Sequence, residues 1–135
     1  MRSLKKAVMA VKQMPNRVIW LTKFWVPVLI CMIFIFYVSS LPGKDIPALF
    51  PFQDILFHGS IYAILGLFFF RALKDTQAKL SLFRLVIATV IFGFLYGASD
   101  EFHQLFVPGR SCSGFDLLVD TCGSLIGSLV GGFLA

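Results

Sequence analysis

The sequence predicts an all-α membrane protein with four transmembrane helices in an antiparallel bundle and both chain termini in the cytoplasm. Of the 135 residues, 58% are hydrophobic and 14% are charged, and the mean hydropathy is +0.85, unlike a water-soluble domain. Four apolar runs of 18 to 21 residues each approach the roughly 20 residues that cross a bilayer. Basic and acidic residues segregate between the connections. We expect a basic cytoplasmic segment, residues 1–23, followed by a four-span domain, residues 24–135.

The first predicted span is residues 24–41, FWVPVLICMIFIFYVSSL. It has no charged side chain, and Pro27 lies near its start, where a membrane helix tolerates proline. Six of the twelve basic residues precede it in the N-terminal segment. Because they lie directly before an apolar run, we interpret them as a topogenic, membrane-surface segment and not as a surface for nucleic acid.

The remaining predicted spans are residues 55–73, 82–99 and 115–135. The second span carries one histidine, His58. The third begins near Arg84, whose long side chain can reach the interface. The fourth finishes at the last residue and has two acidic residues in its first turns. Each run has the length of a membrane helix.

The charge distribution predicts the orientation of the bundle. Ten of the twelve basic residues lie in the N-terminal segment or around the connection between the second and third spans, and six of the seven acidic residues lie on the other side. The positive-inside rule then places residues 42–54 and 100–114 outside the cytoplasm. Cys112 and Cys122 can reach this oxidising side, so a disulfide between them stays open.

Helical spacing places polar residues on one face of each of the last three spans. The third span continues its pattern if the helix extends past Ser99. The fourth carries a repeated G-x-x-x-G, which permits close approach of another helix. If the three faces meet, the bundle is tightly packed inside and ends in a polar cluster at its outer surface. The stripe residues are Asp54, His58, Tyr62 and Gly66, then Gly93, Gly97, Glu101 and Gln104, then Asp116, Asp120, Gly123, Gly127 and Gly131.

The depth of each ionisable residue in the membrane indicates whether it belongs to a functional site or only contacts headgroups and water. His58 and Asp120 lie about a turn inside their spans, where an ionisable group costs a few kcal/mol unless it has a partner. For Asp45, Asp100 and His103 we expect only contact with headgroups and water.

The segment Val107-Pro108-Gly109-Arg110 predicts a chain reversal, because proline fixes φ and glycine accepts positive φ. The reversal aims Arg110 back over the helix ends, where its planar fork can pair with phosphate or carboxylate. An ion pair of Arg110 with Asp116 or Glu101 is a structural alternative. Ser111 or Ser113 can cap the fourth helix.

Three motifs resemble the VanZ-like family: S-S-x-P after the first span, D-x-x-x-H-x-x-x-Y on the second, and E-x-x-Q-x-F-x-P-G-R-x-x-S-x-x-D with a following G-x-x-x-G. They cover about residues 39–131. That family is named for a small membrane protein associated with teicoplanin resistance, so the resemblance implies a bacterial inner-membrane protein without implying a reaction. Asp120 stands where the family more often has Asn. The corresponding residues are Ser40, Pro42, Asp54, His58, Tyr62, Glu101, Gln104, Pro108, Gly109, Arg110, Ser113, Asp116 and Gly123.

These observations predict a site at the outer helix ends that binds, shields or modifies an envelope component, such as a lipid or a cell-wall precursor headgroup. His58, Glu101 and Asp116 are the candidates for acid–base chemistry. The sequence contains no nucleophile motif, P-loop or HExxH, so it indicates no reaction class, and whether the protein is an enzyme stays an open question. We assign no cofactor and no metal. The predicted ligand-binding residues are Asp54, His58, Tyr62, Glu101, Gln104, Arg110, Asp116 and Asp120.

Three alternatives remain. A small proton or solute transporter would need ionisable groups near the midplane, whereas the polar residues gather at one face. A metal site built from five residues lacks the support of an HxxxH or cysteine cluster. An accessory subunit would use the polar patch to dock a partner. The five residues of the metal alternative are Asp54, His58, Glu101, His103 and Asp116.

Overall fold

The computed structural model describes residues 2–134, with side chains for residues 18, 19 and 21–134, and its described part is helical without strands. All four α-helices contain a segment long and apolar enough to cross a membrane. The predicted all-α, four-span fold is therefore confirmed. The elements are α1 (Arg2–Ser39), the short 3-10 helix η1 (Gly43–Asp45), α2 (Gln53–Thr76), α3 (Leu82–Gln104) and α4 (Gly114–Phe133).

The helices are longer than the predicted spans. α1 is continuous from Arg2, so the basic N-terminal segment belongs to the same helix as the apolar segment Leu21–Ser39. α3 continues past Ser99 to Gln104, as the predicted polar stripe on its face requires. Hydropathy marks only the part of a helix that suits hydrocarbon, because backbone hydrogen bonding continues through polar residues beyond it.

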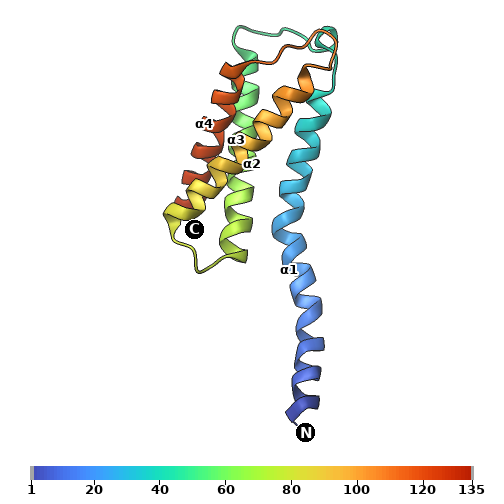
Figure 1. Cartoon of the computed structure of the whole chain (residues 1–135), viewed down its shortest axis with the longest axis vertical. Coiled ribbons are helices and arrows are strands. Elements are labelled where there is room, and N and C mark those ends of the chain that lie inside the picture. Colours follow the sequence, from blue (N-terminus) through green and yellow to red (C-terminus); the bar gives the residue numbers. More distant parts are fainter. Residues whose placement is uncertain (1, 135) are drawn as a thin grey trace.

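The helices run antiparallel, and both long connections lie at the same end of the bundle (Figure 1). We call this end, formed by residues 40–52 and 105–113 with the adjoining helix termini, the pocket end. The short connection between α2 and α3, residues 77–81, lies at the opposite end, as does the C-terminal end of α4. The N-terminal half of α1 extends beyond the bundle on that opposite side (Figure 1).

α2 and α4 pack with almost no space between their backbones. A methyl group on Gly127 would overlap the carbonyl oxygen of Ala63, and one on Gly123 would lie 2.5 Å from the carbonyl oxygen of Gly59. α3 also packs closely on α4, but through α4 side chains, since a methyl group on Gly93 would overlap the Ser124 side chain. The G-x-x-x-G stripe is thus a packing surface, as the sequence predicts.

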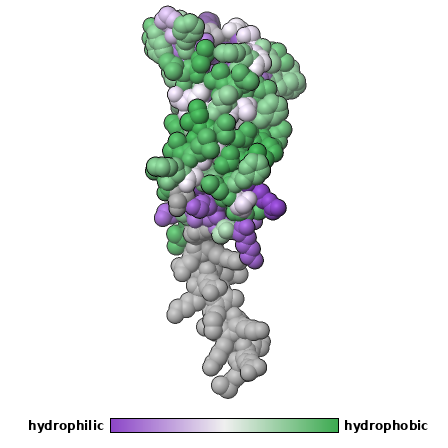
Figure 2. Space-filling model, turned by 90° about the vertical axis from the view of Figure 1, so that its left-hand side faces the viewer, coloured by the Kyte–Doolittle hydropathy of each residue, from purple (hydrophilic) through white to green (hydrophobic). Residues whose placement is uncertain are grey.

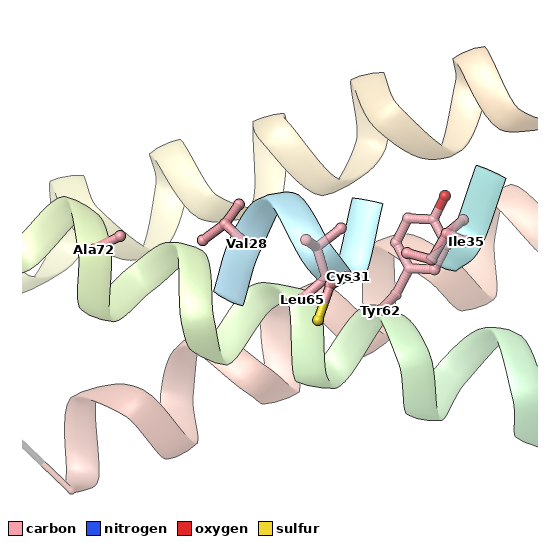
Figure 3. Close-up of a cluster of buried hydrophobic side chains, with 6 residues drawn as sticks. All are labelled: Val28, Cys31, Ile35, Tyr62, Leu65 and Ala72. Carbon is pink, nitrogen blue, oxygen red and sulfur yellow. The ribbon is translucent and has the colours of Figure 1, made fainter. Parts of the chain in front are cut away.

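α1 packs on the outside of this three-helix core through apolar side chains. Tyr96 Oη on α3 also donates a 2.6 Å hydrogen bond to the Met32 carbonyl of α1. These contacts hold α1 beside α2 over its membrane segment (Figure 3). The cluster consists of Val28, Cys31 and Ile35 of α1 with Tyr62, Leu65 and Ala72 of α2.

The surface has the hydropathy of a membrane protein. Figure 2 shows a broad band of hydrophobic residues on the visible face, with hydrophilic residues gathered at its lower border. Many large apolar side chains are exposed, including Ile33, Phe34, Leu95 and Ile126. In water this exposure would be unfavourable, whereas lipid chains solvate such side chains well. The bilayer is therefore the environment that this surface fits.

Candidate functional site

A cavity of about 260 Å³ opens at the pocket end. It lies between the two long connections, the starts of α2 and α4, and the end of α3. Its wall is mostly polar, in contrast to the apolar helix faces around it. The lining residues are Gly43, Ile46, Ala48, Gln53, Asp54, His58, Gln104, Gly109, Arg110, Ser111 and Asp116.

The two long connections touch over this cavity. The Gly43 amide donates a 3.0 Å hydrogen bond to the Pro108 carbonyl, and a methyl group on Gly43 would overlap the Gly109 carbonyl oxygen. Gly109 has a φ of 74°, a conformation that glycine adopts at little cost. The Arg110 amide closes the turn on the Val107 carbonyl at 3.1 Å, so the predicted reversal is confirmed and Arg110 is held beside the cavity.

Gln53 fixes the first connection, a role that the sequence did not reveal. Its side-chain oxygen accepts a hydrogen bond from the Leu49 amide at 2.7 Å, and its side-chain nitrogen donates to the Pro47 carbonyl at 2.8 Å. The two bonds shape the loop whose residues Ile46 and Ala48 line the cavity. A glutamine two residues before a predicted span gives no signal for such a role.

A histidine and a fully buried carboxylate pair at the inner side of the cavity. His58 Nδ1 lies 2.9 Å from Asp120 Oδ1, the only ion pair among the described side chains. Asp120 is 0% exposed, whereas the His58 side chain is 13% exposed and reaches the cavity wall. The sequence singled out these two residues by their depth, and each supplies the partner that the other needs.

Two further carboxylates surround this pair. Glu101 is 2% exposed, and its Oε2 accepts a hydrogen bond from the Ser113 amide at 2.6 Å. Asp100 is 6% exposed, and its Oδ2 accepts from the Gln104 side-chain amide at 3.4 Å. Ser113 Oγ accepts from the Asp116 amide at 3.2 Å, so the predicted cap of α4 is confirmed at Ser113.

The expectation that Asp100 and His103 meet only headgroups and water is wrong. Asp100 is three residues after Gly97 and four before Gln104, so it lies on the same helical face as both and is buried with them. His103 Nε2 lies 3.0 Å from Ser40 Oγ, and its ring stacks on Phe36 at 4.7 Å between centroids. His103 therefore links the end of α3 to the end of α1 through these two contacts, and it does not line the cavity.

Seven of the eight predicted ligand-binding residues lie at the pocket end, and Tyr62 lies deeper along α2. Five of them line the polar cavity, namely Asp54, His58, Gln104, Arg110 and Asp116. Glu101 and Asp120 lie behind His58, within reach of it. Tyr62 is fully buried and lines a second, adjoining space.

This second space is an apolar groove of about 150 Å³ between α1, α2 and α3. It shares five wall residues with the polar cavity, so the two spaces adjoin at Arg110. No sequence pattern indicated it, because it depends on the place of α1 beside α2. Its wall consists of Phe34, Ile35, Val38, Ser39, Ile46, Asp54, Phe57, His58, Ile61, Tyr62, Asp100, Gln104 and Arg110.

Arg110 is the basic side chain that both spaces share. The ion pair with Glu101 or Asp116, which the sequence left open as an alternative, does not form among the described side chains. The buried Arg110 Nε has no hydrogen-bond acceptor among the described residues. A guanidinium in this state is suited to an incoming anion, because it offers a donor without first breaking an ion pair.

His58, Glu101 and Asp120 form the arrangement that could hold a metal ion. Each offers one ligand atom, and these atoms lie within 4.8 Å of one another. Of the five residues in the metal alternative weighed from the sequence, His58 and Glu101 belong to this set. Asp54 and Asp116 line the cavity instead, and His103 contacts α1.

The three cysteines are free in the structure. Cys31 is buried against α2, while Cys112 and Cys122 are exposed and unpaired. The disulfide that the sequence left open does not form here.

The family model for VanZ/LLP1 matches residues 24–134. The match begins at the apolar part of α1 and covers the three helices that build the cavity. The predicted resemblance to the VanZ-like family is therefore confirmed. Comparisons with curated proteins and with solved structures gave no match.

Proposed function

Because this chain belongs to the VanZ/LLP1 family and has four helices that can cross a membrane, we propose that it binds an amphiphile of the bacterial envelope. The anionic headgroup occupies the polar cavity, and one hydrocarbon chain lies in the apolar groove. The protein thereby shields or modifies the headgroup of a membrane lipid or a lipid-linked cell-wall precursor. A link to glycopeptide resistance would follow from action on such a precursor.

The observation that carries this proposal is the adjoining pair of spaces. The cavity of about 260 Å³ has a polar wall, and the groove of about 150 Å³ has an apolar one. Ligand sites of this kind combine apolar walls with a few polar groups that fix orientation. A headgroup with an attached chain matches this division, whereas a small polar solute would leave the groove unused.

The charges in the cavity define the headgroup further. Arg110 offers donors to phosphate or carboxylate oxygens. Asp54 and Asp116 line the same cavity and offer only acceptors when ionised. A ligand therefore needs an anionic group for Arg110 and hydroxyl or ammonium donors for the two acids. Phosphate-linked sugars and zwitterionic lipid headgroups have this combination.

The proposed location is the extracytoplasmic side of the bacterial cytoplasmic membrane. Six acidic residues lie at or near the pocket end, and ten basic residues lie toward the opposite end or the N-terminus. The positive-inside rule then favours cytoplasmic termini and an outward-facing cavity. In a catalytic version, His58, Glu101 and Asp116 would transfer protons to or from the headgroup.

Transport has less support. The buried carboxylates of the described chain, Asp100, Glu101 and Asp120, all belong to the pocket end. Deeper in the bundle, the Thr89 and Ser128 hydroxyls donate to carbonyls of their own helices, so they do not form a relay. An accessory role in docking a partner would not require the groove.

Exchange of Arg110 tests the proposal. We expect wild-type protein in nanodiscs containing phosphatidylglycerol, or a lipid-linked cell-wall precursor, to retain bound amphiphile in native mass spectrometry. Arg110→Ala should weaken binding about 10- to 100-fold, because a hydrogen bond to a charged group contributes about 1.5–3 kcal/mol. Arg110→Lys should fall between the two, since lysine keeps the charge and loses the fork.

Arg84→Ala is the matched control, because Arg84 is exposed at the start of α3, at the opposite end of the bundle. It should bind as the wild type does. Equal retention by Arg110→Ala and Arg84→Ala, or no amphiphile bound to the wild type, would contradict the proposal.

A further inference from the structure

Three buried or nearly buried side chains from three different helices meet behind the polar cavity. His58 lies on α2, Glu101 on α3 and Asp120 on α4, and one ligand atom of each lies within 4.8 Å of the other two. Around a tetrahedral zinc ion with bonds of about 2.1 Å, ligand atoms are about 3.4 Å apart. Side-chain adjustments of about an ångström would bring the three residues to that spacing.

The carboxylates have unused oxygen atoms in this cluster. Glu101 Oε2 already accepts from the Ser113 amide, and Asp120 Oδ1 already contacts His58. The second oxygen of each, Glu101 Oε1 and Asp120 Oδ2, is buried without a hydrogen-bond partner among the described residues. Buried polar atoms are rarely left in this state, and two carboxylates at this distance repel each other unless a cation or protons lie between them.

The donor types select a class of cation. One imidazole nitrogen and two carboxylates supply mixed nitrogen and oxygen ligands with two formal negative charges, which a divalent ion neutralises. Imidazole favours transition metals over Mg²⁺ and Ca²⁺, and the absence of thiolate from the set disfavours Cu⁺. Zn²⁺ is bound by histidine nitrogen and by Asp or Glu oxygen at closely similar distances, so it fits this set best.

The position of His58 places the cluster next to the polar cavity. His58 lines the polar cavity, whereas Glu101 and Asp120 lie behind it. A tetrahedral ion held by the three residues would have one coordination position without a protein ligand. Three protein ligands with one open position are the pattern of catalytic zinc sites, whereas structural sites have four.

We propose that His58, Glu101 and Asp120 bind one divalent transition-metal ion, Zn²⁺ foremost, at the inner wall of the cavity. In so far as it concerns the ligand, this inference rests on the proposed function: the ion adds positive charge beside a cavity that the carboxylates Asp54 and Asp116 also line, and together with Arg110 it contacts the phosphate of the amphiphile. The metal site itself stands on the three side chains alone.

Metal uptake by the full chain in detergent tests the site. Protein stripped with a chelator is titrated with Zn²⁺ against a fluorescent chelating dye, and bound zinc is counted by mass spectrometry. We expect one Zn²⁺ per wild-type chain. Glu101→Gln and Asp120→Asn, which preserve side-chain shape, should each weaken binding at least about 100-fold, because even groups that only orient metal ligands contribute 10- to 100-fold.

Two controls separate this site from other zinc binders. The titrations use a Cys112→Ser, Cys122→Ser background, because both thiols are exposed and thiolates bind zinc. Asp75→Asn and His103→Ala remove an exposed carboxylate at the opposite end of the bundle and the other histidine, and both should keep wild-type affinity. X-ray absorption of the zinc-loaded wild type should give nitrogen and oxygen neighbours at about 2.0–2.2 Å without sulfur, a result that needs no variant to fold.

Mn²⁺ is titrated in parallel, and preference for Mn²⁺ with the same residue dependence would support the site with a different ion. No uptake of either ion by the wild type, or uptake that Glu101→Gln and Asp120→Asn leave unchanged, would overturn it. Amphiphile retention is measured on the same samples. Retained amphiphile without metal would refute only the metal site, and metal without amphiphile would refute only the proposed function.

Discussion

At the scale of single residues, the burial of Asp120 depends on a glycine across the helix interface. A methyl group on Gly97 of α3 would lie 3.0 Å from Asp120 Oδ2 and 3.2 Å from Asp120 Cβ. The absence of a side chain at Gly97 therefore leaves the space that the carboxylate occupies. The geometry of the Asp120–His58 ion pair therefore depends on the distance between α3 and α4 as well as on the two paired residues.

Gly97→Ala should displace the Asp120 carboxylate and weaken its contact with His58. We expect a net loss of up to about 2 kcal/mol in the free energy of unfolding, because overpacking costs about 1–3 kcal/mol and alanine recovers up to about 1 kcal/mol of helix propensity. The measurements are denaturant unfolding in micelles and the NMR shifts of the His58 ring. Gly114→Ala is the control, because nothing lies within 4 Å of a methyl group there. Unchanged His58 shifts in Gly97→Ala would contradict this account.

The sequence allowed the prediction of those site residues whose depth or spacing is visible along one helix. His58 and Asp120 stood out because an ionisable residue inside a span needs a partner. Asp100 was missed because the polar stripe on α3 was followed in a step of four residues, from Gly97 to Glu101. A helix face also includes the residue three positions further on, which after Gly97 is Asp100. The role of Gln53 depends on a loop conformation that local pattern does not reveal.

At the scale of helices, the core consists of α2, α3 and α4, and α1 is added to it. Small residues bring α4 against both neighbours, so backbone atoms of different helices are in direct contact. α1 instead uses larger apolar side chains such as Val28 and Ile35. The tight core fixes the cluster of His58, Glu101 and Asp120, while the looser α1 contact leaves room for the apolar groove.

Gly127→Ala should separate α2 from α4, because its methyl group would overlap the backbone oxygen of Ala63, which no side-chain rotation can move. Overpacking costs about 1–3 kcal/mol, and alanine recovers up to about 1 kcal/mol of helix propensity. Because the overlapped atom belongs to the backbone, the overpacking cost should lie near the upper end of this range, so we expect a net loss of about 2 kcal/mol in denaturant unfolding.

Gly132→Ala is the matched control on the same helix. There the nearest atom is the far end of the Leu82 side chain at 3.1 Å, which can move. This variant should be neutral or gain up to about 1 kcal/mol from propensity. If Gly127→Ala unfolds at the same denaturant concentration as Gly132→Ala, the close contact of α2 and α4 is not rigid.

Hydropathy predicts where membrane helices lie but not which of them are neighbours. The four spans followed from length and composition, and the G-x-x-x-G repeat identified a contact face on α4. The partner of that face could not be predicted, since small residues spaced by four occur both on α2, at Gly59 and Ala63, and on α3, at Gly93 and Gly97. The conformation of the first connection was equally hidden, including the φ of 64° at Phe52.

At the scale of the whole molecule, the chain is electrically asymmetric. The pocket end contains Asp100, Glu101, Asp116 and Asp120, while Lys74, Lys79 and Arg84 lie around the opposite connection. Hydrophilic residues gather at the lower border of the apolar band (Figure 2). Such an asymmetry orients helices during insertion, because basic loops are retained in the cytoplasm.

Cysteine labelling tests the resulting orientation. Cys112 is exposed on the connection between α3 and α4, so in a Cys31→Ser, Cys122→Ser background it is the sole thiol. We expect a membrane-impermeant maleimide to label it in intact cells or spheroplasts. Adding Ala78→Cys to a chain that also carries Cys112→Ser moves the sole thiol to the exposed α2–α3 connection, where labelling should require permeabilised membranes. The reverse pattern would place the cavity in the cytoplasm and remove any access to an outer-leaflet headgroup.

Because Cys112 lies two residues from Arg110, an amphiphile in the cavity should also slow the labelling of Cys112, and Arg110→Ala should abolish that protection.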